Sequence, residues 1–220
     1  MTSSTNPSRG IALSLLAIGL LAPSWAVAQV SMPWYIGASA GTTQASINTA
    51  RILENLTNGG FPNASITEDN RQSAYKVFGG YQFTPNFALE GSFFELGKYG
   101  FTANTTPTGT LTGEIRLRGL ALDAVLITPI NQKFSLFAKL GANYAEARDH
   151  FTATGAVTVS SPNPDTSQLN PKIGVGLKYQ MAEALALRAE LERYRIDDAV
   201  GSRGDIDHLS IGLVYSWANP

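Results

Sequence analysis

Residues 208–217 read HLSIGLVYSW. Every second residue in this stretch is large and apolar, and the series ends in two aromatics: Leu209, Ile211, Leu213, Tyr215 and Trp217. A period of two is typical of a β-strand that has one apolar face. The stretch therefore predicts a strand, and the solvent that meets its apolar face decides the fold.

Eight stretches of the chain show this alternation, each close to the roughly 9–11 residues of a tilted membrane-spanning strand. The predicted strands are Trp34–Thr43, Ala74–Phe83, Phe87–Leu96, Gly113–Ile127, Phe134–Ala145, Pro171–Gln180, Leu185–Arg195 and Asp207–Trp217. The links at 84–86, 128–133 and 181–184 are short, and those at 44–73, 97–112, 146–170 and 196–206 are longer and polar. In an up-and-down order the short links share one end and the long loops the other, as in outer-membrane barrels.

The second face of these strands carries charges and glycines. The charges are Lys76, Glu90, Arg116, Arg118, Lys139, Lys172, Lys178, Arg188, Glu190 and Glu192, and the glycines are Gly80, Gly141, Gly174, Gly176 and Gly212. Glycine weakens a strand, so glycines on this face indicate a crowded barrel interior. An Arg or Lys turned to lipid near the midplane costs about 2–4 kcal/mol. We therefore predict a polar lumen and a lipid-facing apolar surface, whereas a soluble barrel would have its apolar face inside.

The predicted strand at 113–127 changes phase along its length, because Ile115 and Leu117 give way to Leu120 and Leu122. A glycine bulge near Gly119 is the simplest cause. The sequence thus predicts an all-β fold, an eight-stranded antiparallel up-and-down transmembrane β-barrel. Closing the sheet satisfies every backbone group, as the hydrocarbon of a membrane requires.

The first residues predict export. Arg9 precedes an apolar run at 11–21, and the small residues Ala26 to Ala28 follow, which is the pattern of a secretory signal peptide. We expect a signal peptide at 1–28, cleavage between Ala28 and Gln29, and one outer-membrane barrel domain at 29–220. The chain has no cysteine and a net charge of −1, so disulfides are excluded and no nucleic-acid partner is indicated.

Five stretches, taken in order, resemble the OmpA-like transmembrane domain within the wider group of small outer-membrane β-barrels. They are WYIGASAG at 34–41, YKVFGGYQFTPNFALEGSFFELG at 75–97, FSLFAKLGANY at 134–144, LALRAELERY at 185–194 and GSRGDIDHLSIGLVYSW at 201–217. The resemblance covers nearly all of 34–217 and implies location in the bacterial cell outer membrane. Longer members carry a peptidoglycan-binding domain after the barrel, which we do not expect here.

The resemblance also implies two sets of special residues. A lumen ion-pair cluster maps to Glu90, Lys139, Glu190 and Arg203, while Val125 replaces a further lysine and implies a smaller or rearranged network. The carboxy-terminal signal that the outer-membrane assembly machinery reads maps to Ser210, Gly212, Tyr215 and Trp217. It departs from the usual form because Trp217 is not the final residue.

These features favour a structural and surface-display role, with outer-membrane lipid, lipopolysaccharide and the assembly machinery as partners. One alternative is a narrow, low-conductance pore, in which competing lumen ion pairs open and close a water path. Another is an adhesin or ligand-binding barrel that contacts a host or surface ligand through its long loops. The loop at 44–73 has apolar residues for such a contact: Ile47, Ile52, Leu53, Leu56 and Phe61.

An enzymatic reading rests on two residues. His208 and Ser210 form the His-x-Ser arrangement of outer-membrane lipid A deacylases, and a serine nucleophile needs an adjacent base. Both residues fall on the predicted lumen face, away from acyl chains, so we expect no catalytic residues and no hydrolase. The sequence contains neither a phosphate-binding glycine loop nor metal-ligand spacing, and no cofactor or metal is expected.

Overall fold

The computed structural model describes residues 32–45, 53–54, 57–60, 65–105, 109–155, 165–197 and 203–217. Within these ranges the strands are β1 (Trp34–Ala45), β2 (Ser65–Asp69), β3 (Arg71–Thr84), β4 (Phe87–Thr105), β5 (Gly109–Pro129), β6 (Phe134–Gly155), β7 (Asp165–Gln180), β8 (Leu185–Asp197) and β9 (Arg203–Trp217). None of the helical residues described belongs to a helix long and apolar enough to cross a membrane. The predicted cleavage between Ala28 and Gln29 lies outside the described residues and stays a prediction.

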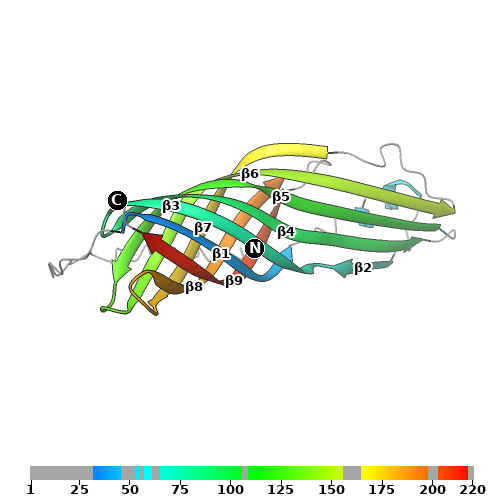
Figure 1. Ribbon diagram of the computed structural model, residues 1–220. Coiled ribbons are helices and arrows are strands. Elements are labelled where there is room, and N and C mark those ends of the chain that lie inside the picture. The colour runs from blue at the N-terminus through cyan, green and yellow to red at the C-terminus, as the bar shows by residue number, and fades with distance from the viewer. Residues whose placement is uncertain are drawn as a thin grey trace, which may run out of the picture. The chain divides into compact units, whose positions relative to one another are not determined.

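Eight of these nine strands close a ring (Figure 1). Its order is β4-β3-β1-β9-β8-β7-β6-β5, and β5 pairs back onto β4. Every pairing is antiparallel, and the first and last strands meet with Trp34 opposite Trp217. The short strand β2 pairs with the far half of β4 and continues the line of β3 beyond Asn70. The prediction of an eight-stranded antiparallel barrel is confirmed.

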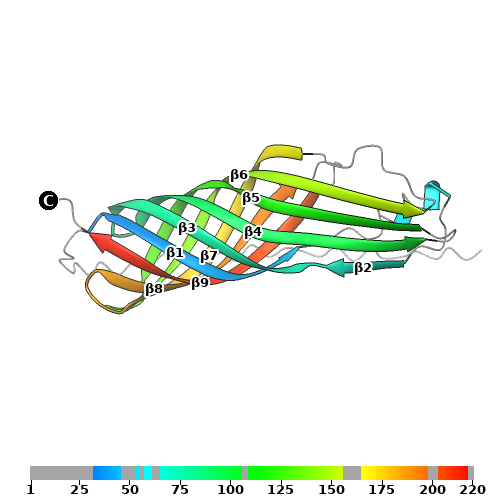
Figure 2. The same cartoon turned by 45° about the vertical axis from the view of Figure 1, so that its right-hand side comes forward.

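The three short links are confirmed, but the strands at the other end are much longer than predicted. β4, β5 and β6 contain 19, 21 and 22 residues, about twice the 9–11 that a membrane-spanning strand needs. The predicted loop at 97–112 is therefore mostly strand, with residues 106–108 between β4 and β5. In Figure 2, β2, β4, β5 and β6 run well beyond the other strands.

An apolar band covers the outer face of the ring in the half nearest the short turns. Its exposed side chains include Ile36, Val77, Leu89, Phe93, Leu120, Leu122, Leu126, Leu140, Ile173, Val175, Leu191, Leu209, Ile211 and Leu213. Leu209 and Trp217 bound the band on β9; the eight residue steps between them span about 27 Å along the strand, or about 20 Å at a 40° tilt. The apolar face points outward, as predicted.

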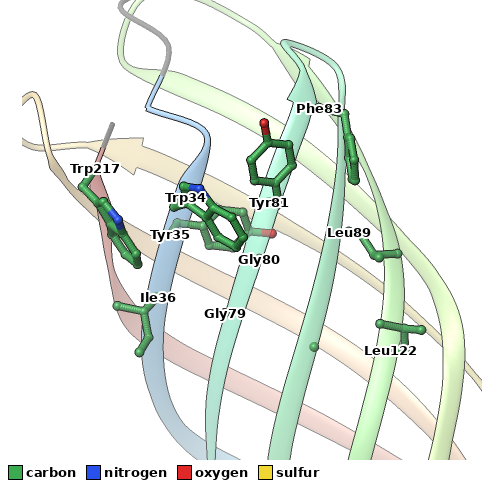
Figure 3. Close-up of a pocket in the computed structure, with 11 residues that line it drawn as sticks. Trp34, Tyr35, Ile36, Gly79, Gly80, Tyr81, Phe83, Leu89, Leu122 and Trp217 are labelled. Atoms are coloured by element: carbon green, nitrogen blue, oxygen red, sulfur yellow. The ribbon is translucent and has the colours of Figure 1, made fainter. Parts of the chain in front are cut away.

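The turn end of this band is aromatic. The rings of Trp34 and Tyr81 meet edge to face with centroids 4.8 Å apart, and those of Tyr215 and Trp217 stack with centroids 6.1 Å apart. Close by, the absence of side chains at Gly79 and Gly91 leaves a hollow of 390 Å³ on the outer face (Figure 3). Amphipathic rings favour the depth of the membrane interface, so these aromatics mark the membrane boundary at the turn end of the barrel.

Beyond the apolar band the outer face of the sheet becomes polar and the inner face becomes apolar, and this corrects the prediction for β5. Arg116 and Arg118 lie on the outer face, and Ile115 and Leu117 point inward, so the prediction that both arginines face the lumen is wrong. Here β5 has left the hydrocarbon, so its outer face meets water and its inner face packs on apolar neighbours. No change of strand phase is needed, only a change of solvent.

The predicted bulge at Gly119 is wrong as well. Gly119 stays in register, opposite Phe94 on β4 and Ala145 on β6. The register shift between β4 and β5 lies instead between Glu95 and Gly97, where Gly97 has a φ of +92°. This left-handed conformation suits glycine because it has no Cβ.

Side chains fill the interior in layers. Near the turns, an apolar cluster contains Tyr35, Phe78, Ala88, Val125, Phe137, Ala186 and Val214. Toward the long strands, a second contains Ala45, Ala74, Phe94, Leu96, Tyr99, Leu117, Ala121, Ala145, Ala147, Tyr194 and Ile206. Inward glycines make room for the rings, since a Cβ on Gly80 would overlap the Tyr35 ring and one on Gly176 that of Phe137. The crowded interior predicted from the glycines is confirmed.

Candidate functional site in the barrel lumen

Eight charged side chains lie inside the barrel among these apolar residues, and we call them the lumen cluster. Its members are Lys76 on β3, Glu90 on β4, Asp123 on β5, Lys139 on β6, Lys172 on β7, and Arg188, Glu190 and Glu192 on β8. Each side chain is at most 6% exposed. Four cations face four carboxylates, so the cluster is neutral when all eight are ionised. Buried charges are tolerated only when paired in this way.

Lys139 is the centre of the cluster. Its Nζ lies 2.6 Å from Glu90 Oε1, 3.1 Å from Glu190 Oε2 and 3.2 Å from Glu192 Oε1. Alternation on β6 turns Lys139 inward while Ala138 and Leu140 face lipid, which is why one lysine reaches carboxylates on both β4 and β8. A single ammonium donates to three carboxylates across the lumen.

The other two lysines extend the cluster. Lys76 Nζ pairs with Glu190 and lies 2.6 Å from Glu192 Oε2. Lys172 Nζ lies 2.6 Å from Asp123 Oδ2 and 2.8 Å from Glu192 Oε1. Glu192 therefore contacts all three lysines, and it also accepts a 3.1 Å hydrogen bond from the Tyr194 hydroxyl.

Arg188 lies at the turn side of the cluster. Its Nη1 donates to Glu90 Oε2 at 2.7 Å, and its Nε faces Glu190. The guanidinium carbon sits 4.3 Å from the centre of the Phe137 ring and 4.7 Å from that of Phe78. Cation–π attraction is strongest for such desolvated cations. The arginine thus joins the charged layer to the apolar layer beneath it.

The structure brings together three of the four residues predicted for the ion-pair cluster: Glu90, Lys139 and Glu190. The fourth, Arg203, opens β9 opposite Asp197, and its side chain lies outside the described residues. By register its backbone is seven positions along β9 from Ser210, the partner of Glu190. The arginine that contacts both glutamates is Arg188.

Sequence reasoning placed Lys76, Lys172 and Glu192 on the lumen face without assigning them to the cluster, and it missed Asp123. The signal was present, because Asp123 and Val125 share one face of β5 and Val125 had already been placed in the lumen. Val125 is 3% exposed and belongs to the turn-side apolar cluster. Val125 thus packs in the apolar layer beside the lumen cluster, and whether the network is smaller than or rearranged from that of the family stays a prediction.

His208 and Ser210 lie inside the barrel, at 0% and 4% exposure. His208 Nδ1 is 3.6 Å from Glu192 Oε2, but neither ring nitrogen nor Ser210 Oγ has a hydrogen-bond partner among the described residues. The His-x-Ser pair is therefore walled off from the lipid-facing surface, where acyl chains lie. In the part of the chain that the structure describes, no group of His, Asp or Glu could hold a metal ion.

The four residues predicted as an assembly signal are divided between the faces of β9. Tyr215 and Trp217 point outward at the turn end, and Ser210 points inward. Gly212 lies against β1, where an added Cβ would come 2.6 Å from Ser39 Cβ. Recognition of this strand by the assembly machinery stays a prediction.

A closed antiparallel ring, an apolar outer band and a charged lumen define a small outer-membrane β-barrel. The chain belongs to the OmpA-like transmembrane domain family, whose family model matches residues 29–219. The protein is accordingly an outer-membrane protein of a bacterium.

Two solved structures share the fold, and a third is matched at a lower TM-score. Neisserial surface protein A (NspA) superposes with a TM-score of 0.57 and 10% identity, over 85% of this chain and 98% of NspA. The outer membrane protein OprG from Pseudomonas aeruginosa gives 0.50 and 11% identity, over 85% of this chain and 97% of OprG. Ail, the attachment invasion locus protein of Yersinia pestis, gives 0.47 and 17% identity, over 84% of this chain and 99% of Ail. A comparison with curated protein sequences finds no match.

Proposed function

We propose that the protein is a rigid structural barrel of the outer membrane that presents its long strands and loops at the cell surface. The observation that supports this role is the lumen, in which a neutral charge cluster lies against apolar layers. Strands β4, β5 and β6 continue far beyond the apolar band, so the barrel also supports a β-sheet platform outside the hydrocarbon.

The lumen cluster cross-links the whole ring. Its eight charges come from β3 to β8, Tyr35 on β1 donates to Glu90 Oε2 at 3.0 Å, and His208 on β9 faces Glu192. Seven of the eight ring strands are thus joined by ion pairs or hydrogen bonds, and β9 places His208 beside them. Removing one partner from such a network leaves an uncompensated buried charge, which typically costs about 3–5 kcal/mol. The charges therefore resist deformation of the barrel.

Among the described residues, the turn side of the lumen leaves little room for a water path. An inner cavity bordered by Tyr35, Lys178 and Arg188 has a volume of 30 Å³. Such a space holds about two water molecules at most. This favours a closed scaffold over an open pore.

Planar-bilayer recording of the folded protein tests the proposal. We expect no steady conductance from the natural sequence, with insertion verified by protease protection in vesicles of the same lipid. Steady, voltage-independent current that disappears in Glu190→Ala with Lys139→Ala would refute the scaffold and assign a pore.

A second candidate function, a gated narrow pore, is favoured by the geometry of Lys139. Its three carboxylate partners lie within 3.2 Å, so a small side-chain movement exchanges one ion pair for another. This model predicts brief openings whose frequency changes in Lys139→Arg.

Binding through the long loops also stays a prediction, because most of residues 46–64 and all of 156–164 and 198–202 lie outside the described residues.

A further inference from the structure

Three neighbouring strands bring three cations into one row on the outer face of the barrel. Lys98 on β4 is directly opposite Arg116 on β5, and Arg116 is directly opposite Arg148 on β6. All three side chains are exposed. We call these residues the cationic row.

Such a row is unfavourable unless a ligand compensates it. Like charges directly opposite each other in a sheet are destabilising, since their Cβ atoms lie only about 4.5–5.5 Å apart. Lys98 and Arg116 form no ion pair with any described side chain. Glu146 Oε1 accepts from Arg148 Nε at 2.6 Å, but its Oε2 also accepts from Arg118 Nε at 3.0 Å. One carboxylate is therefore shared by two arginines.

Other acidic groups nearby offset the positive charge only in part. Lys98, Arg116, Arg118 and Arg148 carry four positive charges on this face, whereas Glu95, Glu114 and Glu146 carry three negative ones. Glu95, opposite Arg118, accepts a hydrogen bond from the Tyr75 hydroxyl. Glu114 faces His150, in the row farther from the membrane. On β7 the residue opposite Arg148 is Asp165, whose side chain lies outside the described residues. The described charges nearest to Arg116 within its row are both positive.

The opposite side of the ring is built differently. Arg193 on β8 makes a two-pronged ion pair with Asp207 on β9, at 2.6 and 2.7 Å. Arg195 lies 3.5 Å from Asp205 in the next row. There each outward arginine has its own carboxylate, so the uncompensated charge is local to β4, β5 and β6.

The depth of the cationic row indicates its ligand. Phe93, Leu120 and Tyr144 form the last lipid-facing row on these strands, and Arg116 follows Leu120 by four residues. Four residues advance about 13 Å along a strand, or about 10 Å at a 40° tilt. That height lies just outside the headgroup layer, whose thickness is about 5–8 Å on each side of the hydrocarbon. The long side chains can reach down toward it.

We propose that the cationic row binds a phosphate group of a phosphorylated glycolipid, of the lipid A type, in the outer leaflet. Guanidinium groups match phosphate oxygens in two-pronged geometry, and lysine adds a point charge. Two outward arginines and a lysine can thus surround one phosphate at the membrane surface. The inference is independent of whether the lumen conducts.

Binding of lipid A to the folded protein in detergent micelles tests the inference. The probes are lipid A with its phosphates, dephosphorylated lipid A and inorganic phosphate at equal phosphate concentration. The double variant Lys98→Gln with Arg116→Gln is compared with Lys133→Gln, which removes a charge from a short turn. We expect the double variant to bind phosphorylated lipid A at least tenfold more weakly and Lys133→Gln to bind it normally.

Stability without lipid provides the second measurement. Because the double variant relieves repulsion, we expect its unfolding temperature to equal or exceed that of the natural sequence when no lipid is added. Equal binding of dephosphorylated lipid A would overturn the proposal. So would binding of inorganic phosphate that the double variant loses, because the row would then take soluble phosphate rather than a lipid.

Discussion

Gly212 of β9 lies directly opposite Ser39 of β1, at the seam where the first and last strands close the barrel. A Cβ on Gly212 would overlap the backbone of Ala38 and approach Ser39 Cβ to 2.6 Å. We therefore expect Gly212→Val to open the seam and to destabilise the barrel by about 1–3 kcal/mol, as overpacking does. Urea unfolding followed by heat-modifiable gel mobility measures the loss. The control is Gly91→Val, because no atom lies within 4 Å of a Cβ at Gly91; equal losses in both variants would contradict the prediction.

Removing Lys139 should be more damaging than removing another inward lysine. Lys139→Met leaves Glu90, Glu190 and Glu192 without their shared partner, and we expect the free energy of unfolding to fall by about 3–5 kcal/mol. Lys178→Met is the matched control, since Lys178 points inward near the turns and forms no ion pair with a described side chain. The same unfolding experiment compares them, and similar stabilities would show that the cluster does not hold the ring together.

The exchange of faces along the barrel predicts two different solvents on one outer surface. Spin labels at Val175 and Ile211 should collide readily with dissolved oxygen, which concentrates in the hydrocarbon, and little with a water-soluble nickel complex. A label at Arg116 should show the reverse. Electron spin resonance in lipid vesicles measures both collision rates. Labels at Val175 and Ile211 that report a dry core in a protein soluble without detergent would refute the membrane fold.

The sheet outside the membrane should loosen in acid before the barrel does. Hydrogen bonds from Arg148 and Arg118 lower the pKa of the Glu146 carboxyl. A lowered folded-state pKa means that the stabilisation is present above the unfolded pKa of about 4.3 and is lost as pH falls through the folded value. Hydrogen exchange of β5 and β6 near Glu146 should therefore quicken between about pH 5 and pH 3. Glu146→Gln should lose this pH dependence, and an unchanged acid response in that variant would assign it to another group.

The orientation of the strands in the membrane half of the barrel can be predicted from the sequence. With a period of two and lipid on one side, only the apolar face of each strand can point outward. Val175 and Ile211 had to face outward, and Lys139 and Glu190 inward. The short turns were equally readable, since Pro85 and Asn86 interrupt the alternation. The class of fold needed no long-range information.

The outer half could not be read in the same way. Periodicity shows that the two faces of a strand differ, but it does not show which solvent touches each face. The prediction that Arg116 and Arg118 face the lumen applies the orientation expected in lipid to a part of β5 that lies outside the hydrocarbon. The partners within the lumen cluster depend on register between strands distant in sequence. Arg188 and Glu190 are two residues apart on one face of β8, so alternation alone brings them together. Only the pairing of β8 with β9 places Arg203 seven positions from Ser210, the partner of Glu190.

The change from apolar to charged residues along the outer face of β5 also fixes how deeply the barrel sits in the membrane. If the barrel sank by one row, Arg118 would enter the hydrocarbon, and if it rose by one row, Leu120 and the other residues of its row would be exposed to water. Both displacements raise the free energy of the protein in the membrane, so the barrel has one preferred depth in the bilayer. A bilayer of the wrong thickness must itself thin or thicken around the protein to meet it.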